Sequence, residues 1–460
     1  MTLFDQRLTR RRFISGAATV AAGAAAVACA PPGTTTGGGE KPSVPQTNKE
    51  LKILTWNHFI PEFDKFFDPW VQQWGQSHNI TVSIDHINIA DIPARAAAEV
   101  AAQAGHDLIQ FIGQPSTYLF EHSLIDLGDV VKYAEDKLGP LDPASNKIGK
   151  VNGTWRGWPN FFIDQPLIVR RDVAQQVGED PDSIKGWQDV LRVGTKMKAA
   201  GKPGGIAISH CNDSNHNLRS IMWSFGASEV ASDGTTIAAD SSQMRDFLSF
   251  MQEFYHKALY EDVFAWQDVS DNQWYDSGNG GFIHDAISAL NSVRGKTVGG
   301  IDLFGQAKTY SPMVSKAHPN GLDMPDYCAY GLWKWSPNQD NAKKFLRYNV
   351  DNYLTIFQQS RDYNSPTHFK LFDKGIYNDK SVGGEFLDVE KFGPLAKWKG
   401  DNIATWGYPG PPTAQANQFL SQYVLPDTVQ QAVRGTTKTE VDNAVKFCVS
   451  QMKGIPGYKS

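Results

Sequence analysis

Three apolar runs between residues 51 and 112 decide the fold of this chain: Leu51-Lys-Ile-Leu-Thr-Trp56, Ile80-Thr-Val-Ser-Ile84 and Asp107-Leu-Ile-Gln-Phe-Ile112. Between the first two runs, apolar residues recur at helical spacing from Phe63 to Trp74, which predicts an amphipathic helix. The Ala-rich segment 92–104 predicts a second helix before the third run. This alternation is typical of an α/β fold with a parallel, doubly wound sheet. Ligands bind beyond the carboxyl ends of such strands.

Similar patterns continue along the rest of the chain. Residues 161–169 predict the strand on which the chain leaves its first domain, and residues 280–285 predict a return strand. Met244 to Leu259 predicts a long amphipathic helix. In the final segment, Thr437 and Glu440 form a capping box at the start of another helix. Its predicted buried stripe consists of Val441, Ala444, Val445, Cys448, Val449 and Met452.

Composition limits the class of protein. The chain has 460 residues, which is too long for a single core and suits two domains. Its net charge is −5 and it has no basic run beyond its first residues, so nothing indicates nucleic-acid binding. No segment after Ala28 has the apolar length that a membrane-spanning helix needs. We expect a soluble body that works as a monomer and needs no cofactor.

The first residues predict export and attachment to a membrane. Arg10-Arg-Arg-Phe-Ile14 resembles the twin-arginine signal, which directs a folded protein across a membrane. Val27-Ala-Cys29 resembles a lipoprotein signal-peptidase box, although Ala26 stands where such boxes usually carry Leu. We therefore expect residues 1–29 to be a signal peptide with lipidation at Cys29, and residues 30–49 to be a flexible tether. An ordinary secretory peptide is the alternative. The expected location is the outer face of the cytoplasmic membrane or the periplasm.

The order of these segments resembles family 1 of the bacterial extracellular solute-binding proteins, which includes maltose-binding-protein-like sugar receptors of ABC importers. The resemblance covers residues 50–453. The stretches that carry it are Ala97–Ile112, Leu124–Leu127, Gly157–Pro159, the helix at Trp187, Gly281–Ala286, Trp335–Leu346, Val433–Gly435 and Thr437–Met452.

This resemblance implies a two-lobed, type II periplasmic-binding-protein fold with discontinuous domains joined by hinge crossovers. The first lobe would comprise residues 50–160 plus 285–336, and the second lobe residues 161–284 plus 337–460. A carbohydrate would bind between the lobes, which would close on it by hinge motion and deliver it to the ABC transporter permease subunits. Such a protein is not an enzyme.

A sugar site needs aromatic rings for the apolar sugar faces and polar side chains for the hydroxyl groups. His284 and Asp285 stand at or beside a position where sugar-binding relatives often have Trp, which suggests a more polar contact there. The candidate ligand-binding residues are Trp56, Asn57 and Gln114 at strand ends, Asn217, Arg219 and Trp223 on a helix, His284 and Asp285 on the return strand, and Trp266, Tyr363 and Trp406 in loops.

Three other interpretations remain open. The run from Ser209 to His216 has side chains that a metal could use, but its spacing matches no standard zinc pattern, so we expect no metal site. The run from Leu54 to Pro61 is also similar to the opening strand of polyamine receptors, whose ligands would need cleft carboxylates such as Asp164 and Asp285. An exported carbohydrate-active enzyme is the third possibility, although no nucleophile elbow, paired-carboxylate signature or HExxH motif occurs.

Overall fold

The computed structural model describes residues 49–113 and 116–460. These residues belong to the larger of two units into which the chain divides, Gln46–Ser460. The predicted signal peptide, Cys29, the tether up to residue 48 and Gln114 lie outside the described residues. Within the described part, no helix is both long and apolar enough to span a membrane.

The first sheet has six strands in the order β13-β6-β12-β3-β1-β2. β1 runs parallel to β2 and β3, whereas β12 runs antiparallel to β3 and β6. The predicted α/β alternation is confirmed, but the sheet is mixed because β12 returns from a later part of the chain in the opposite direction. The strands are β1 (Glu50–Trp56), β2 (Thr81–Ile87), β3 (Leu108–Phe111), β6 (Trp158–Ile163), β12 (Asp326–Leu332) and β13 (Ser365–Pro366).

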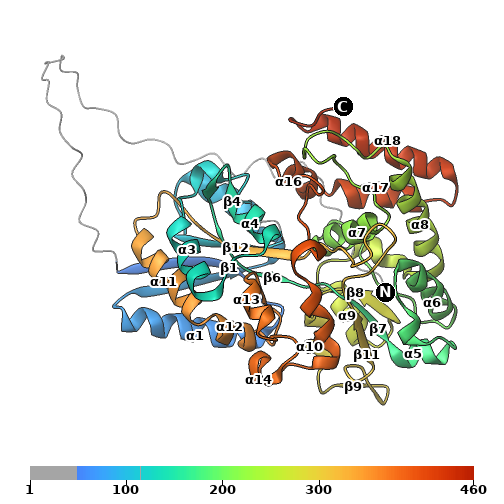
Figure 1. Ribbon diagram of the computed structural model, residues 1–460, viewed down its shortest axis with the longest axis horizontal. Coiled ribbons are helices and arrows are strands. Elements are labelled where there is room, and N and C mark those ends of the chain that lie inside the picture. The colour runs from blue at the N-terminus through green and yellow to red at the C-terminus, as the bar shows by residue number, and fades with distance from the viewer. Residues whose placement is uncertain (1–48, 114–115) are drawn as a thin grey trace, which may run out of the picture. The chain divides into compact units, whose positions relative to one another are not determined.

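Helices α1 (Pro61–Ser77), α3 (Gly128–Leu138), α11 (Gln339–Asp351) and α12 (Tyr353–Gln359) pack around this sheet. The predicted apolar face of α1 is confirmed, since Phe63, Phe67, Val71 and Trp74 are buried. The ring of Phe345 on α11 packs against Trp74, with 5.2 Å between the ring centroids. Figure 1 shows α1, α11 and α12 beside the first sheet.

The second sheet has three antiparallel strands in the order β11-β7-β8: β11 (Ala307–Tyr310), β7 (Leu167–Arg170) and β8 (Phe282–His284). Helices α6 (Trp187–Ala199), α8 (Ser242–Ala258), α17 (Val424–Val433) and α18 (Lys438–Gly454) pack against one another beside it (Figure 1). The capping box of α18 is present as predicted. Of its predicted stripe, Val449 is only partly buried, whereas the other residues are buried.

The described part contains further α-helices and strands. The helices are α2 (Ile92–Ala102), α4 (Pro143–Gly149), α5 (Arg171–Gln176), α7 (Asn212–Ser224), α9 (Ser270–Asp276), α10 (Ser288–Val293), α13 (Phe369–Asp373), α14 (Lys380–Gly383), α15 (Val389–Phe392) and α16 (Ala414–Ser421). The strands are β4 (Lys150–Val151), β5 (Thr154–Trp155), β9 (Thr297–Val298) and β10 (Ile301–Asp302).

Two segments of the chain pack on a different sheet from the one that the expected lobe boundaries imply. β11 lies within 285–336, which we assigned to the first lobe, but its backbone pairs with β7 of the second sheet. α11, α12 and β13 lie within 337–460, which we assigned to the second lobe. They pack on the first sheet and its helices, because the apolar face of α11 is buried there. The chain therefore crosses from the first sheet to the second at residues 164–166 and returns to the first sheet at residues 311–325. It leaves the first sheet again after β13.

Candidate functional site

The centre of the candidate site is α7, a helix with a polar sequence that is buried along its whole length. It begins at Asn212, so most of the polar run from Ser209 to His216 lies in its first turns. Buried polar groups need hydrogen-bond partners. Asn215 Nδ2 donates to the carbonyl oxygen of Leu420 at 3.1 Å, and Asn217 Nδ2 donates to that of His284 at 2.6 Å. These bonds fix α7 against α16 and β8.

Three carboxylates meet beside α7 and form what we call the aspartate cluster: Asp213, Asp271 and Asp285. One carboxylate oxygen of each lies within 4.8 Å of the other two, and all three side chains are buried. Asp213 is in the first turn of α7, Asp271 is in the first turn of α9, and Asp285 directly follows β8. Three segments that are distant in sequence thus bring their carboxylates to one point.

Gln165 connects this cluster to the first sheet. Its Nε2 donates a hydrogen bond to Asp213 Oδ1 at 2.9 Å and to Asp326 Oδ2 at 3.3 Å. Gln165 lies on the first passage between the two sheets, and Asp326 is the first residue of β12. A fifth carboxylate, that of Asp268, accepts a hydrogen bond from the backbone N–H of Asp213 at 3.2 Å. The site is therefore acidic and built from both sheets.

Burial controls the ionisation of these groups. It raises the pKa of Asp213 well above the ordinary range, and the neighbouring carboxylate of Asp271 raises it further. Burial followed by a neighbouring carboxylate likewise raises the pKa of Asp271 and of Asp285. No Lys or Arg of the described chain forms an ion pair with the cluster. Arg219, on the same helix as Asp213, is paired with Glu229 at 2.8 Å.

His216 does not supply the missing positive charge. Its Nδ1 lies against Asp326 Oδ1. However, burial lowers the pKa of His216 to about 3, so the imidazole is neutral at pH 7. The carboxylates thus lie together in a low-dielectric place without a compensating cation, which favours their protonated forms.

Two of the expected aromatic residues pack on one histidine ring. Trp56 at the end of β1 stacks on His58, with ring centroids 4.7 Å apart, and Tyr363 packs edge-on against the same His58 ring at 5.1 Å. The carboxylates of Asp326, Asp285 and Asp213 raise the pKa of Tyr363 beyond the increase that burial causes. The Tyr363 hydroxyl is therefore within electrostatic range of the cluster.

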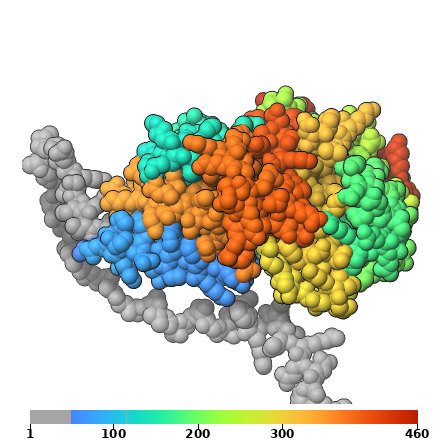
Figure 2. Space-filling model, turned by 60° about the horizontal axis from the view of Figure 1, so that its bottom comes forward, coloured from blue at the N-terminus to red at the C-terminus, as the bar shows by residue number. Residues whose placement is uncertain are grey.

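The segment 361–386, which we call the closing segment, links the two sides of the site. Arg361 forms an ion pair with Glu62 of α1 at 3.6 Å, and its carbonyl oxygen accepts a hydrogen bond from Asn291 of α10 at 3.1 Å. The carbonyl oxygen of Phe386 accepts from Arg294 at 2.9 Å. Figure 2 shows this part of the chain, in orange, on the surface between the blue N-terminal part and the yellow part.

A pocket of about 540 Å³ lies at this edge of the site. Its lining includes Glu62, Arg361, and Asn272 and Gln273 of α9. Asn272, which lines the pocket, directly follows Asp271 of the aspartate cluster in the chain.

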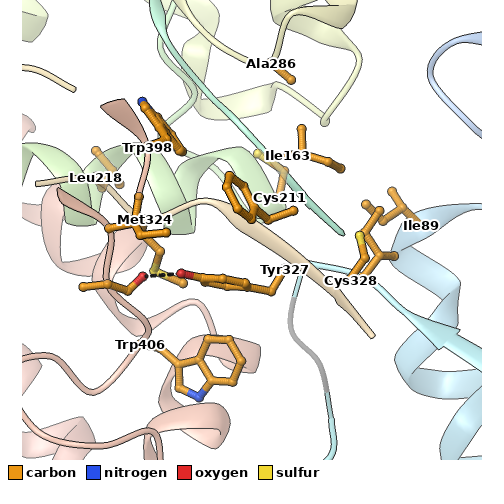
Figure 3. Packing of buried hydrophobic residues seen from close by; sticks show 14 of the residues in the cluster. Ile89, Ile163, Cys211, Leu218, Ala286, Met324, Tyr327, Cys328, Trp398 and Trp406 are labelled. Carbon is orange, nitrogen blue, oxygen red and sulfur yellow. Dashed lines mark hydrogen bonds between the residues drawn. The ribbon is translucent and has the colours of Figure 1, made fainter. Parts of the chain in front are cut away.

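The remaining expected residues have other surroundings. Arg219 pairs with Glu229, the Trp223 ring packs on Tyr408 at 5.1 Å, and the Trp266 ring packs on Trp274 at 6.0 Å. Trp406 is fully buried. Figure 3 shows it in the apolar core with Tyr327, whose hydroxyl donates to the carbonyl oxygen of Ala404 at 3.4 Å.

Two further candidates, His284 and Asn57, form hydrogen bonds through their backbone atoms. The carbonyl oxygen of His284 accepts the bond from Asn217, while its ring packs edge-on against Trp187 at 5.1 Å. Burial lowers the pKa of this ring to about 3. The backbone N–H of Asn57 donates to the carbonyl oxygen of Ile87 at 2.8 Å, and its side chain is exposed. Ligand contact by the candidate residues stays a prediction.

Sequence reasoning missed Asp213, Asp268, Asp271 and Asp326 as site residues. A local signal was available for two of them, because Asp268 and Asp271 follow the aromatic Trp266 and have no basic neighbour up to Asp276. Nothing in the sequence indicates, however, that these acids meet Asp285.

Comparisons with known proteins agree with this architecture. The family model described as bacterial extracellular solute-binding protein matches residues 70–361. A search of curated proteins finds no match.

Several solved structures share the fold. Maltose-bound T. maritima MalE3 is 20% identical, with a TM-score of 0.70 over 88% of this chain and 99% of that one. An ABC transporter solute-binding protein from Thermotoga lettingae TMO, bound with alpha-D-tagatose, is 15% identical, with a TM-score of 0.70 over 87% and 100% of the two chains. A sugar transporter from Arthrobacter chlorophenolicus A6 with bound laminaribiose is 14% identical, with a TM-score of 0.70 over 88% and 99%.

Proposed function

The chain belongs to the family of bacterial extracellular solute-binding proteins, and on this premise we propose that it captures a carbohydrate for an ABC importer. The carbohydrate, a mono- or oligosaccharide, binds between the two sheets and is delivered to the permease subunits in the membrane. The protein binds without catalysing a reaction. Maltose, tagatose and laminaribiose in the structures of similar fold support this choice of solute.

The observation that carries this proposal is the polar site that joins the two sheets through Gln165. Gln165, Asp213 and Asp326 offer hydrogen-bonding groups of the kind that sugar hydroxyls need. Trp56 and Tyr363 provide aromatic rings for an apolar sugar face. A ligand held by groups from both sheets stabilises the closed arrangement by its higher affinity for that state.

The same proposal includes the location of the protein. Residues 1–29 direct export, Cys29 carries the lipid, and the tether lets the binding body reach its permease. Two acyl chains on this cysteine would give a stable anchor, whereas one would give only weak attachment. The protein then works as a monomer at the outer face of the membrane.

The test is a thermal-shift and calorimetry screen of the purified protein with neutral mono- and oligosaccharides and with amino sugars. A carbohydrate at a hundred times its Kd should stabilise the protein by about 2.7 kcal/mol, and chromatography should recover it unchanged. Failure of every carbohydrate to raise the Tm, or release of a product, would contradict the proposal.

A pair of matched variants locates the site. Tyr363→Phe removes a hydroxyl near the cluster and should weaken carbohydrate binding. Tyr348→Phe removes a hydroxyl on α11, where the ring stacks on Trp70 at 4.5 Å, and should leave binding unchanged. Equal effects of both variants would place the carbohydrate elsewhere.

A further inference from the structure

The aspartate cluster has the geometry of an acceptor site for three hydrogen bonds. Asp213, Asp271 and Asp285 each direct one carboxylate oxygen to the same small region, with all three oxygens within 4.8 Å of one another. A primary ammonium group has three N–H donors and no acceptor. Three converging carboxylate oxygens match that group better than they match a hydroxyl, which donates only one hydrogen bond.

Two buried amide oxygens without partners provide a second, independent observation. Gln165 and Asn217 are both at least nine-tenths buried, and each uses its amide nitrogen as a donor. Their oxygen atoms, Gln165 Oε1 and Asn217 Oδ1, have no hydrogen-bond partner. The Gln165 amide is bonded directly to Asp213, so its oxygen belongs to the same site.

The carboxylates themselves also have acceptor atoms to spare. Oδ2 of Asp213, of Asp271 and of Asp285 has no hydrogen-bond partner. With its carboxyl groups ionised, the state that an ammonium ligand would favour, the site has an excess of buried acceptors and lacks donors, although buried polar groups normally find partners. A ligand that fits must bring several donors.

The charge of the site leads to the same conclusion. Arg219 is occupied by Glu229 and by Asn215, whose carbonyl oxygen lies 2.8 Å from Arg219 Nη1. No Lys or Arg of the described residues, Arg219 included, is paired with the cluster. A buried negative charge is stable only when it is paired or protonated.

We propose that the solute carries a protonated primary amine, and that Asp213, Asp271 and Asp285 bind this ammonium group. This inference rests on the proposed function, because it names the class of solute that the same site takes. The amine belongs to an amino sugar, whose ring lies against Trp56 and Tyr363. The shared chemistry, an ammonium group, could also come from an aliphatic polyamine, and the experiment separates the two.

The experiment is calorimetry and thermal shift on the purified protein at pH 7.5. The probes are D-glucosamine and chitosan disaccharide, their neutral counterparts D-glucose and N-acetylglucosamine, spermidine, and calcium chloride. We expect the amino sugars to bind and the neutral counterparts to bind at least tenfold more weakly. Binding of spermidine alone would support the ammonium site and contradict the carbohydrate proposal.

Asp271→Asn tests the cluster directly, because it removes one ionisable carboxyl group and keeps the shape. Loss of one partner of a buried charge pair should weaken binding of the amine about 30-fold or more. The Tm of the free variant should not fall, since the amide has the shape of the carboxyl group and cannot take on the negative charge that burial disfavours. The matched control is Asp340→Asn, in the first turn of α11, where the side chain is exposed.

Other results would overturn the inference. Neutral sugars that bind as tightly as amino sugars, with no effect of Asp271→Asn, would leave the proposed function standing and remove the ammonium site. Stabilisation by calcium alone would identify a metal site instead. Absence of binding by every amine would also overturn it. If Asp271→Asn does not fold, as judged by circular dichroism, Asp285→Asn takes its place with the same expectations.

Discussion

Gln165 donates a hydrogen bond of 2.9 Å from its side-chain amide to the carboxylate of Asp213, although one residue lies on the passage between the sheets and the other on α7. The same amide reaches Asp326 of β12 at 3.3 Å. A single side chain thereby joins the first sheet, the passage and the buried polar helix. Movement of the sheets relative to each other would have to break these bonds.

The first prediction concerns this connection. Gln165→Leu should lower the free energy of unfolding by about 1–3 kcal/mol, because acceptors on Asp213 and Asp326 lose their donor while they stay buried. Solute binding should weaken as well. Urea unfolding and calorimetry measure the two effects. Gln72→Ala, an exposed change on α1, is the control and should be within about 0.5 kcal/mol of the wild type. A loss of stability without weaker binding would show that Gln165 has only a structural role.

The closing segment leads to a kinetic prediction. Arg361→Ala removes the ion pair with Glu62, both of which are partly exposed, so the stability should change by less than about 1 kcal/mol. The dissociation rate of the solute should rise, since Arg361 helps to hold the two sides together. Stopped-flow fluorescence measures that rate. Glu62→Gln should have a similar effect, and the double variant should add little to either change. Additive effects would contradict a shared role.

The buried carboxylates predict how stability depends on pH. Burial raises the pKa of Asp164 to about 8 and that of Asp323 to about 7, whereas an unfolded aspartate titrates near 3.9. Above about pH 6.5 the folded protein thus binds more protons than the unfolded chain. Its free energy of unfolding must fall as the pH rises from 6.5 to 8. Each group contributes up to about 1.4 kcal/mol per pH unit.

Below about pH 6.5, buried histidines change the free energy of unfolding in the opposite direction, so the prediction applies to the range from pH 6.5 to 8. His58, with a pKa lowered to about 4 by burial, stays neutral in the folded protein while the unfolded chain takes up a proton below about 6.5. Urea titrations at pH 6.5 and pH 8 test the prediction, and Asp164→Asn should reduce the difference between them. The control variant Asp340→Asn should leave that difference unchanged. Higher stability at pH 8 than at pH 6.5 would contradict it.

The Trp223→Ala variant tests whether Trp223 is a core residue or a ligand contact. Trp223→Ala should lower the free energy of unfolding by about 3–5 kcal/mol, because the ring is completely buried and packs on Tyr408. Thermal unfolding of the variant measures this. A stable variant that has lost solute binding would instead make Trp223 a ligand contact, as the resemblance implied.

The proposed anchor is tested in cells. Cys29→Ala should release the protein from the membrane fraction and leave solute affinity unchanged, because the lipid and the binding site are separate. Fractionation followed by immunoblotting measures the location. Retention of the variant in the membrane would contradict lipidation at Cys29.

Local patterns predicted much of the secondary structure. The alternation from Leu51 to Ile112 predicted β1, α1, β2, α2 and β3, and the capping box at Thr437 predicted the start of α18. These signals succeed because helical spacing and capping depend on residues within a few positions of one another. Local patterns do not locate the start of α7, since its first turn is polar and is stabilised by distant partners such as Leu420.

The amino-acid sequence alone thus predicts the α/β class, the order of most elements and the resemblance to solute-binding proteins. It does not predict that β11 joins the second sheet, that α11 packs on the first, or that Asp213, Asp271 and Asp285 meet. Strand partners and buried clusters are set by contacts between residues far apart in the chain, and these appear only in the folded protein. A carboxylate's pKa likewise depends on burial and on neighbours that no local pattern reveals.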